Sequence, residues 1–347
     1  MLGYPMSLQY LRNVSLIVGT AGGQGLQLGN LRIVFEVKRG DLETPNTCDV
    51  RVYNLSDTTA NQLRSGQNGL PEFTQLQLST SYGVQPLAQI FWGSIVQVRS
   101  GREDQRNSYV DITAADGDEP YNFAVSAFSL NSGSQAFTPI QRILADMARW
   151  SFGDPTQTSS NGQGVSMGYV PPDVQNNTNR SIRGRVYFGD CRREMRQLAK
   201  NQDCQWSIQD HQLTFIPNTG YIPEPPILIT PGTGLIGTPE QTQSGLKVRV
   251  LLNPSIKIGR TIKLDFSNIN QLRYGQEVGS PATNLQLQDS VTKMNAQGLY
   301  YVMRAEHTGD SRGVPWYTDL TCLAVDATNI PANVTASTTV SGVINRY

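Results

Sequence analysis

The chain has 347 residues, which is too long for one small core and suits two or three domains. Lysine plus arginine and aspartate plus glutamate both number 28, so no net charge would draw the protein to nucleic acid or to an anionic membrane. Charged residues make up only 16% of the chain, below the roughly 25% of an average domain. This suits a β-rich protein whose surface is largely covered by partners, although many plain β domains share it.

The four cysteines, Cys48, Cys191, Cys204 and Cys322, are scattered and form no Cys-x-x-Cys pair. Three of them fall on apolar faces of predicted strands or helices, so we expect buried free thiols and synthesis in a reducing compartment. The first ten residues lack a basic start followed by an apolar core, and no apolar run approaches the ~18–20 residues of a membrane-spanning helix. We therefore expect neither a standard export signal nor insertion into a membrane.

Residues 1–118 are predicted to be almost entirely β. Strands are predicted at 14–18, 31–37, 47–54 and 73–82, and in a hairpin with arms at Phe91 and Val110. A short helix is predicted at 57–64, with Ser56 as its N-cap. Five or six strands are enough to close a small barrel or sandwich.

Residues 119–232 differ in kind and predict a small α/β domain. A helix is predicted at 138–150, with Thr138 as its N-cap and Pro139 at the first helical position, where the missing N–H costs nothing. Its apolar residues fall at i, i+3, i+4 and i+7, namely Ile140, Ile143, Leu144 and Met147.

The rest of this segment alternates loops with short regular elements. Residues 154–179 are rich in Gly, Ser, Asn and Pro, which predicts a flexible loop. A second helix is predicted at 190–201 and leads into a hairpin over 204–216 that turns at Asp210 and His211. The proline-rich stretch 217–226 predicts a stiff connector.

Residues 233–326 predict a second β unit. Two strands lie within 245–264, and alternation over 298–325 predicts a long hairpin with a Gly/Asp-rich tip at 309–313. Residues 327–347 have no helical period and many β-branched residues. They predict an extended C-terminal arm that is ordered only where a partner holds it.

The β pattern occurs twice in the chain. When the sequence is shifted by 210 positions without gaps, residues of the early copy align with residues of the late copy. The aligned pairs are Phe91–Trp92 with Tyr301–Val302, Val110 with Leu320, Ile112 with Cys322, Ala114 with Ala324, and Asp116 with Asp326. Each copy has a charged tip between its arms. We therefore interpret the chain as carrying two copies of one β unit.

Two glycine-rich motifs are similar to catalytic or phosphate-binding loops. Gly164–Gly168 matches the G-x-S-x-G nucleophile elbow, but no strand is predicted before it and no helix after it, so we interpret it as a chance match. Gly22–Gly29 follows an apolar strand, as a phosphate-binding loop would. It lacks the Lys-Ser/Thr of such a loop and precedes another strand, so we interpret it as a hairpin tip.

Only two histidines are available to a metal site, and the sequence places them far apart. His211 is predicted in a turn and His307 near a hairpin tip, with no carboxylate or thiolate at ligand spacing beside either. Residues 116–119, Asp-Gly-Asp-Glu, could bind calcium weakly, but an ordinary acidic turn is the better interpretation because further oxygen ligands are missing. We therefore predict no catalytic site, no metal and no cofactor.

The strongest charge feature is a basic run formed by Arg180, Arg183, Arg185, Arg192, Arg193, Arg196 and Lys200. No series of aromatic residues is interleaved with it and the whole chain is neutral, which disfavours a nucleic-acid site. A solvated helix face or an intersubunit salt-bridge surface is the better interpretation, and both alternatives remain open.

Several segments, taken in their order and spacing, give the chain a family resemblance. They are Leu31–Leu55, Leu235–Thr242, Leu252–Pro254 with Ile258–Arg260, and His307–Gly313 with Trp316–Tyr317. On these segments the chain resembles the baseplate hub proteins of contractile-tailed bacteriophages. These segments lie in both β units and in the stretch that leads into the second unit.

The resemblance implies a mainly β fold with two tail-tube-like β-barrels, at 1–118 and 233–326, and the small α/β domain 119–232 between them. It also implies a homotrimer, in which three chains present six similar barrels as a pseudo-sixfold ring. Such a ring would join the sixfold tail tube to the threefold central spike. Barrel edges would pair with neighbours, and the long hairpins with charged tips would line the channel or reach the next ring.

The implied partners are further copies of the chain, the tail tube protein, the central spike protein and other baseplate proteins, with the tape measure protein as an additional candidate. Genomic DNA would meet the protein only while passing through the channel. The protein would be made in the host cytoplasm and reside in the tail baseplate of the virion. Deleting 331–347 is expected to leave the barrels folded and to weaken attachment below the ring.

Two other functions remain open alongside a non-enzymatic structural role. A tail-tip hydrolase acting on cell-wall glycan or peptide would need two carboxylates in a cleft or a zinc-binding histidine pair, and neither can be placed from the sequence. A β-rich receptor-binding protein is compatible with the Asn/Thr-rich surface and the loop 154–179.

Overall fold

The computed structural model describes residues 11–19, 25–64, 75–150, 164–242, 245–264 and 298–325. The described residues form two compact units: the first contains those between 11 and 217 together with 307–316, and the second contains those between 218 and 306 together with 317–325. The predicted C-terminal arm, 327–347, lies outside the described residues. The predicted domain boundaries at 118 and 232 stay predictions.

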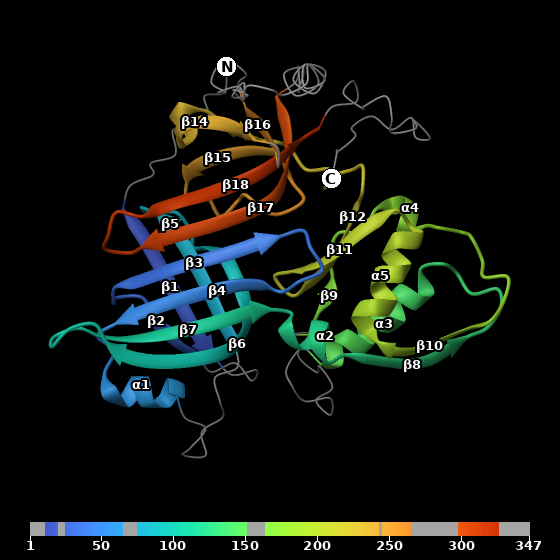
Figure 1. The fold of residues 1–347 in the computed structure, drawn as a ribbon, viewed down its shortest axis with the longest axis horizontal. Coiled ribbons are helices and arrows are strands. Elements are labelled where there is room, and N and C mark those ends of the chain that lie inside the picture. Colours follow the sequence, from blue (N-terminus) through green and yellow to red (C-terminus); the bar gives the residue numbers. More distant parts are fainter. Residues whose placement is uncertain are drawn as a thin grey trace, which may run out of the picture. The chain divides into compact units, whose positions relative to one another are not determined.

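The first unit is built on an antiparallel sheet with the strand order β3-β4-β7-β6-β5-β1-β2 (Figure 1). Its strands are β1 (Arg12–Gly19), β2 (Gly25–Leu28), β3 (Ile33–Gly40), β4 (Asn46–Tyr53), β5 (Gln75–Tyr82), β6 (Ala88–Arg102) and β7 (Ser108–Asp116). Because successive strand residues point to opposite faces, alternation in the sequence becomes one buried face. On β3, for example, Phe35 and Val37 are buried while Glu36 is half-buried.

The helix α1 (Asp57–Arg64) follows β4 as the sequence predicts. The Ser56 hydroxyl accepts a hydrogen bond from the Thr59 backbone N–H at 3.2 Å, which confirms the predicted N-cap. The mainly β fold class is confirmed as well. Closure of the sheet into a barrel remains a prediction, because the pairings among the described strands form a linear order.

The first unit also contains an α/β block. Its elements are α2 (Asp118–Asn122), β8 (Val125–Leu130), α3 (Thr138–Arg149), β9 (Ser166–Met167), α4 (Pro172–Gln175), β10 (Arg185–Asp190), α5 (Cys191–Asn201), β11 (Cys204–Gln209) and β12 (Gln212–Pro217). The apolar faces predicted for both long helices are buried in one core, around Met147, Met195 and Trp206. Asp190 caps α5 by accepting a hydrogen bond from the Arg192 N–H at 2.9 Å.

Two predictions about this block are wrong in part. Thr138 is the first residue of α3 and Phe137 occupies the N-cap position, so the threonine hydroxyl does not cap the helix. The described part of the predicted loop, 164–179, contains β9 and α4, and Val165 and Val170 are buried in the core of the block. Apolar contacts therefore order a stretch whose glycine and proline content predicts a loop; residues 154–163 lie outside the described part.

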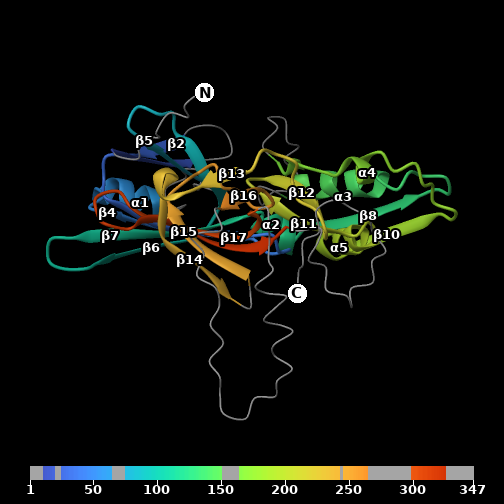
Figure 2. The ribbon, with the colours of Figure 1, turned by 90° about the horizontal axis from the view of Figure 1, so that it is seen from above.

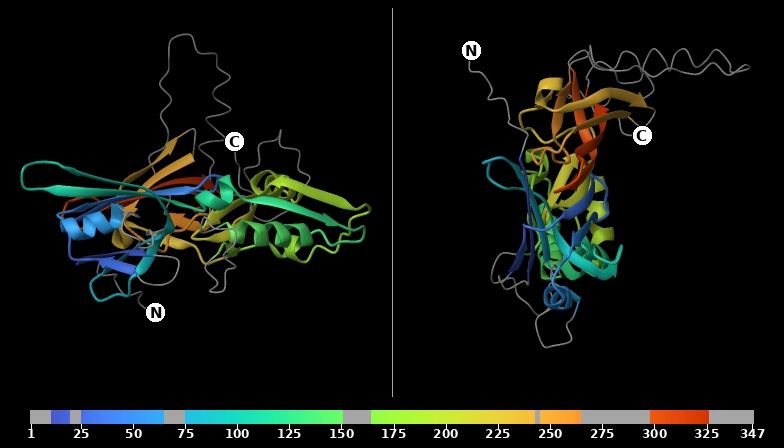
Figure 3. Two further views of the ribbon diagram at one scale, coloured as in Figure 1. Left: turned by 90° about the horizontal axis from the view of Figure 1, so that it is seen from below. Right: turned by 90° about the vertical axis from the view of Figure 1, so that its left-hand side faces the viewer.

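The strands β8 and β10 form a two-stranded ribbon with α3 and α5 on one side (Figure 3). The opposite face of the ribbon is apolar and open to solvent. On this face Val125, Val186 and Phe188 are 57%, 72% and 75% exposed, and Phe123, which precedes β8, is 58% exposed. An exposed apolar face of this kind is typical of surfaces that a partner covers.

The second unit has its own core, which includes Val248, Val302 and Leu320. Its elements are β13 (Ile227–Ile229), the short 3₁₀ helix η2 (Pro231–Thr233), β14 (Leu235–Thr242), β15 (Gly245–Leu251), β16 (Thr261–Leu264), β17 (Leu299–Asp310) and β18 (Trp316–Ala324). The hairpin β17–β18 has its base in the second unit and its tip, 307–316, in the first.

The same strand order occurs in both units. In the first unit the order β3-β4-β7-β6-β5 is followed, and in the second β14-β15-β18-β17-β16 repeats it, with the strands in the same sequence along the chain. The prediction of a duplicated β unit is therefore confirmed at the level of strand order. One difference is that β1 pairs with β5 antiparallel, whereas β13 pairs with β16 parallel.

Candidate functional site

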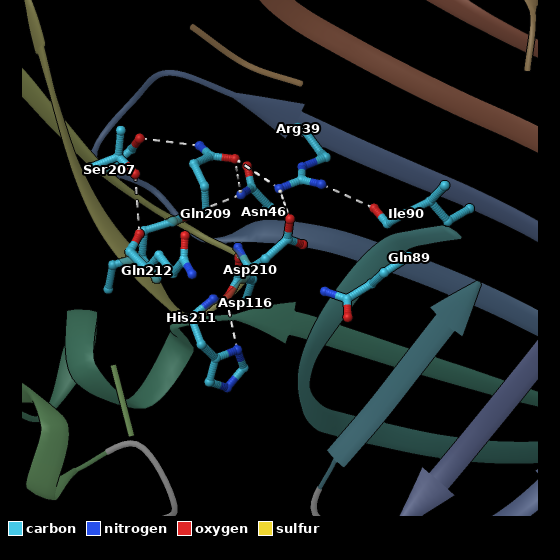
Figure 4. Close-up of polar contacts among 12 residues, drawn as sticks. Arg39, Asn46, Gln89, Ile90, Asp116, Ser207, Gln209, Asp210, His211 and Gln212 are labelled. Carbon is cyan, nitrogen blue, oxygen red and sulfur yellow. Dashed lines mark hydrogen bonds and ion pairs between the residues drawn. The ribbon is translucent and has the colours of Figure 1, made fainter. Parts of the chain in front are cut away.

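The sheet and the α/β block of the first unit meet at a buried polar junction (Figure 4). Arg39, at the end of β3, forms an ion pair with Asp210 in the β11–β12 turn, with Nη2 and Oδ2 3.0 Å apart. The same guanidinium donates to the Ile90 carbonyl at 3.1 Å and to Gln209 Oε1 at 3.2 Å. Both charged side chains are largely withdrawn from water, at 3% and 11% exposure.

Asp116 is the second acidic residue of the junction. Its carboxylate accepts hydrogen bonds from the backbone N–H groups of Asp210 at 2.6 Å and His211 at 3.1 Å. His211 Nδ1 lies 3.2 Å from Asp116 Oδ1, and the imidazole stacks on Trp92 with ring centroids 4.4 Å apart. The turn is tight, because both Asp210 and His211 adopt positive φ angles.

Asn46 and Gln209 complete the junction with amide hydrogen bonds. Asn46 Nδ2 donates to the Ile208 carbonyl at 3.1 Å and to Gln209 Oε1 at 3.0 Å, while Gln209 Nε2 donates to the Gly40 carbonyl at 2.8 Å. These bonds join the β3–β4 turn to the tip of the β11–β12 hairpin. The junction thus fixes the block against the sheet.

His307, on β17, is fully buried near Arg39 and Asp210. Burial and the neighbouring Arg39 charge lower the pKa of His307 to about 3, while Asp210 acts in the opposite direction. The imidazole is therefore neutral at physiological pH. Among the described residues, no group of three or more His, Cys, Asp and Glu side chains is arranged to hold a metal ion.

The sequence failed to predict this junction. It placed no carboxylate near either histidine, yet Asp116 reaches His211 across 95 residues of chain. It also interpreted Asp116 as part of an ordinary acidic turn, whereas this carboxylate is buried and only the following residues begin the helix α2. The one available signal was the predicted turn at Asp210 and His211; only the structure shows that both residues adopt positive φ, which is uncommon for residues other than glycine.

The two glycine-rich motifs do not form loops of the catalytic kind. Ser166 of the G-x-S-x-G motif lies in β9, which pairs in parallel with β12, so its backbone is extended and not the sharp turn of a nucleophile elbow. Of the Gly22–Gly29 segment, the described part forms β2 and pairs with β1. This agrees with the interpretation of a hairpin, whose tip lies outside the described residues.

Two arginines of the basic run contact an acidic residue of the same chain. Arg192 donates to the Glu43 carbonyl at 2.6 Å, and the Arg196 guanidinium pairs with the Glu43 carboxylate. Both contacts join α5 to the β3–β4 turn. The acidic partner of these two arginines is 149 or more positions away in the same chain. The Arg193 and Arg196 side chains are still 65% and 54% exposed, in agreement with a solvated helix face.

Each unit also carries one cluster of an arginine, an aspartate and a tyrosine. In the first unit, Arg51 on β4 makes a bidentate pair with Asp111 on β7, at 2.7 and 3.0 Å, and its guanidinium lies 4.1 Å from the Tyr109 ring centroid. In the second unit the same three residue types recur as Arg249, Asp319 and Tyr317.

The geometry of the second set repeats that of the first. Arg249 pairs with Asp319 at 2.6 and 3.0 Å, and its guanidinium lies 4.3 Å from the Tyr317 ring centroid. The paired carboxylates raise the pKa of Arg51 and of Arg249. We call these sets the first and second Arg–Asp–Tyr clusters. Both lie on the sheet face opposite the core, since their strand neighbours are buried.

The clusters correct the predicted offset of the duplication. The register pairs Arg51 with Asp111 and Arg249 with Asp319, so Asp111 corresponds to Asp319 and not to Thr321. The true offset in this strand is two residues shorter than 210. The sequence did carry the signal, because Val-Arg-Val occurs at 50–52 and 248–250, and Tyr-x-Asp-x-Thr at 109–113 and 317–321.

A surface hollow of about 670 Å³ lies over the second cluster. Three acidic residues line it, namely Glu240, Glu306 and Asp319. Glu306 pairs with Arg304 and Asp319 pairs with Arg249, so two of these acids are held as salt bridges.

The tips of the two long hairpins differ. The tip of β6–β7 extends beyond the other strands of the first unit (Figure 2) and is exposed, with Asp104 accepting hydrogen bonds from the N–H groups of Arg106 and Asn107 at 2.7 and 2.6 Å. The tip of β17–β18 is fixed to its own chain. Asp310 accepts a hydrogen bond from Arg32 at 2.8 Å, and Trp316 Nε1 donates to the Tyr82 hydroxyl at 2.9 Å.

The tip of the second hairpin is therefore anchored to its own chain, and the prediction that the two hairpins line a channel or reach the next ring stays a prediction. Ser311 bonds both backbone groups of Ile33 on β3: its N–H donates to the Ile33 carbonyl at 2.9 Å, and its hydroxyl accepts from the Ile33 N–H at 2.9 Å. Gly309 lies against the Phe35 ring, where a side chain would collide. The anchored tip is not fully covered, since Val314 is 89% exposed.

All four cysteines are free and buried, as the sequence predicts. Burial raises the pKa of Cys191 to about 12, an effect that its hydrogen bond with Ser126 partly opposes. No helix in the described part of the chain is long and apolar enough to cross a membrane.

No model of a known protein family matches the sequence, and no curated protein matches it. The fold, however, is similar to that of solved tail proteins. A 43 kDa tail protein of prophage MuSo2 from Shewanella oneidensis has a TM-score of 0.51 at 8% identity, over 93% of this chain and 99% of that chain. A tail protein from Neisseria meningitidis MC58 has a TM-score of 0.52 at 9% identity, over 90% of this chain and 96% of that chain. At such identities the likeness concerns the fold.

Proposed function

We propose that the chain is a non-enzymatic structural protein of a contractile phage tail, and that it forms the hub of the baseplate. In this proposal three chains assemble into a ring in which six like β units surround a channel. The ring joins the sixfold tail tube to the threefold central spike. The protein would reside in the virion and contact tube, spike and other baseplate proteins.

The observation that carries this proposal is the repeated strand order of the two units. A chain with two like units converts threefold symmetry into approximate sixfold symmetry, because three copies then present six similar surfaces. The fold likeness to two tail proteins supports the tail assignment. The resemblance of the sequence to baseplate hub proteins supports the assignment to the hub.

The mass of the purified full chain in solution tests the proposal. Light scattering should give about three times the 38.2 kDa of one chain, because the ring is proposed to be a trimer. A monomer at every concentration measured would contradict it. A monomer that turns over cell-wall glycan would favour the hydrolase, and a monomer that binds the host envelope would favour the receptor-binding protein.

A further inference from the structure

The two Arg–Asp–Tyr clusters occupy equivalent places in the two units. Val34 stands opposite Arg51 in the β3–β4 register, and Ile236 stands opposite Arg249 in the β14–β15 register. Beyond the paired aspartates, Thr113 and Thr321 follow at the same spacing. Each unit thus presents an aliphatic residue, the Arg–Asp pair, a tyrosine and a threonine on one exposed sheet face.

Charges beside the clusters are also paired. On the first face Lys38 lies 3.1 Å from Glu36, and on the second face Arg304 pairs with Glu306. A bidentate carboxylate occupies the same guanidinium donors that would otherwise bind a phosphate. Both faces are therefore polar but offer few free cations.

One equivalent position differs in charge. Asp49 faces Thr113 on the first unit, and Lys247 faces Thr321 on the second. On the first face Arg99 stands opposite Asp111 and offsets the charge of Asp49, and on the second face Glu240 stands opposite Lys247. Each of these charges therefore has an opposite charge on its own face.

We propose that the two clusters line the channel of the ring as equivalent, self-neutralised surfaces, past which DNA moves without being held. This inference rests on the proposed function. In a stack of rings, strand edges meet neighbours in the same ring, and strand ends and loops meet the rings above and below. The broad middle of an exposed sheet face is then left for the channel wall or the outer surface of the ring. The repetition of the cluster in both units favours the channel wall, where a passing polymer meets all six units alike.

The test uses the full chain with Asp111→Asn and Asp319→Asn together, which frees both arginines and nearly preserves side-chain volume. A short linear DNA duplex and a closed circular DNA serve as probes, and fluorescence anisotropy or gel retention reports binding. The double variant should bind the linear duplex at least about tenfold more tightly than the unchanged protein. The log–log salt slope should steepen by roughly one for each freed arginine that reaches a phosphate. The closed circle should not bind, because it has no end to enter a channel.

The matched control is Glu194→Gln with Glu224→Gln. It changes the net charge equally and frees one arginine in each unit, Arg193 and Arg260, away from the clusters. The control should leave DNA binding unchanged. Equal binding by the control, no gain in the cluster variant, or equal binding of the circle would each overturn the inference.

Light scattering on the same samples separates the two proposals. A trimer that fails any of these DNA tests overturns the channel assignment and leaves the proposed function standing. A monomeric mass overturns the proposed function, and the channel assignment is rejected with it.

Discussion

At the scale of single residues, the buried pair Arg39–Asp210 determines how the α/β block is held. Its two charges are withdrawn from water and satisfied mainly by each other and by neighbouring amides. A buried pair contributes little net stability compared with apolar side chains, but removing one partner leaves an uncompensated charge. The pair therefore matters more for the position of the block than for the free energy of unfolding of the whole unit.

Arg39→Met should lower the free energy of unfolding by about 3–5 kcal/mol, because Asp210 would stay buried without its counter-ion. Urea unfolding followed by tryptophan fluorescence measures the change. Arg193→Met is the matched control, since Arg193 forms an exposed pair with Glu194, and its effect should stay within about 0.5 kcal/mol. Equal losses in the two variants would contradict the role given to burial.

His307 should make the first unit less stable in acid. Its pKa is about 3 in the folded chain against 6.5 ordinarily, so between these values only the unfolded chain takes up the proton. Stability is complete above pH 6.5 and falls by about 1.4 kcal/mol per pH unit below it. Arg39 and Asp210 are the charged groups that act on this imidazole, and Arg39 adds to the effect of burial.

The measurement compares unfolding in urea near neutral pH with unfolding about 1.5 units below the ordinary histidine pKa. The loss of stability in His307→Gln should be smaller than in the unchanged protein by about 2 kcal/mol. An identical loss in both proteins would show that His307 is not the group that titrates.

At the scale of elements, the two long hairpins share an origin in the repeated pattern but end differently. Burial raises the pKa of Asp310, and the Arg32 hydrogen bond and the Arg312 N–H lower it, with a net lowering. Asp104 occupies an exposed turn, where backbone N–H groups lower the pKa of its carboxyl. The same residue type thus anchors one tip to the chain and only shapes the other.

Asp310→Ala should reduce the free energy of unfolding by about 1–3 kcal/mol, because Arg32 and a backbone N–H lose their acceptor at a largely buried site. Asp104→Ala should have little effect on the melting temperature, because its tip contacts solvent. Differential scanning calorimetry of both variants measures these changes in stability. A larger loss from Asp104→Ala would contradict the assignment of the free and the anchored tip.

At the scale of the whole molecule, two units of like strand order each have a separate apolar core. Ile112 and Leu320 occupy equivalent positions, opposite Val50 and Val248 in their registers, and both are buried. Substitution at either position removes the same kind of contact from a different core. The repeat can therefore be tested by its energetics as well as by its geometry.

Ile112→Ala and Leu320→Ala should each cost about 2–5 kcal/mol, from lost apolar transfer and the cavity left behind. Hydrogen exchange should show the loss of protection first in the unit that carries the substitution. Equal loss of protection in both units from either variant would indicate one cooperative core instead of two.

Much of the fold follows from local pattern. Alternation in 31–37 and 298–325 predicts strands that the structure contains, and the apolar spacing after Thr138 predicts α3. The local pattern also misplaces the N-cap of α3 by one residue, and it predicts a loop where Val165 and Val170 are buried. Local propensity loses there to apolar contacts made with distant segments.

The amino-acid sequence alone determined the β-rich class, the two principal helices, the buried thiols and the existence of a repeat, because each depends on the spacing of residues close together in the chain. Only the tertiary structure decided the junction of Asp116 with His211, the pairing of Glu43 with Arg196, and the exact counterpart of Asp111. These depend on which distant segments meet and in which register. A shift of two residues preserves the alternation of buried and exposed positions, and only the side chains that face each other across the strands reveal it.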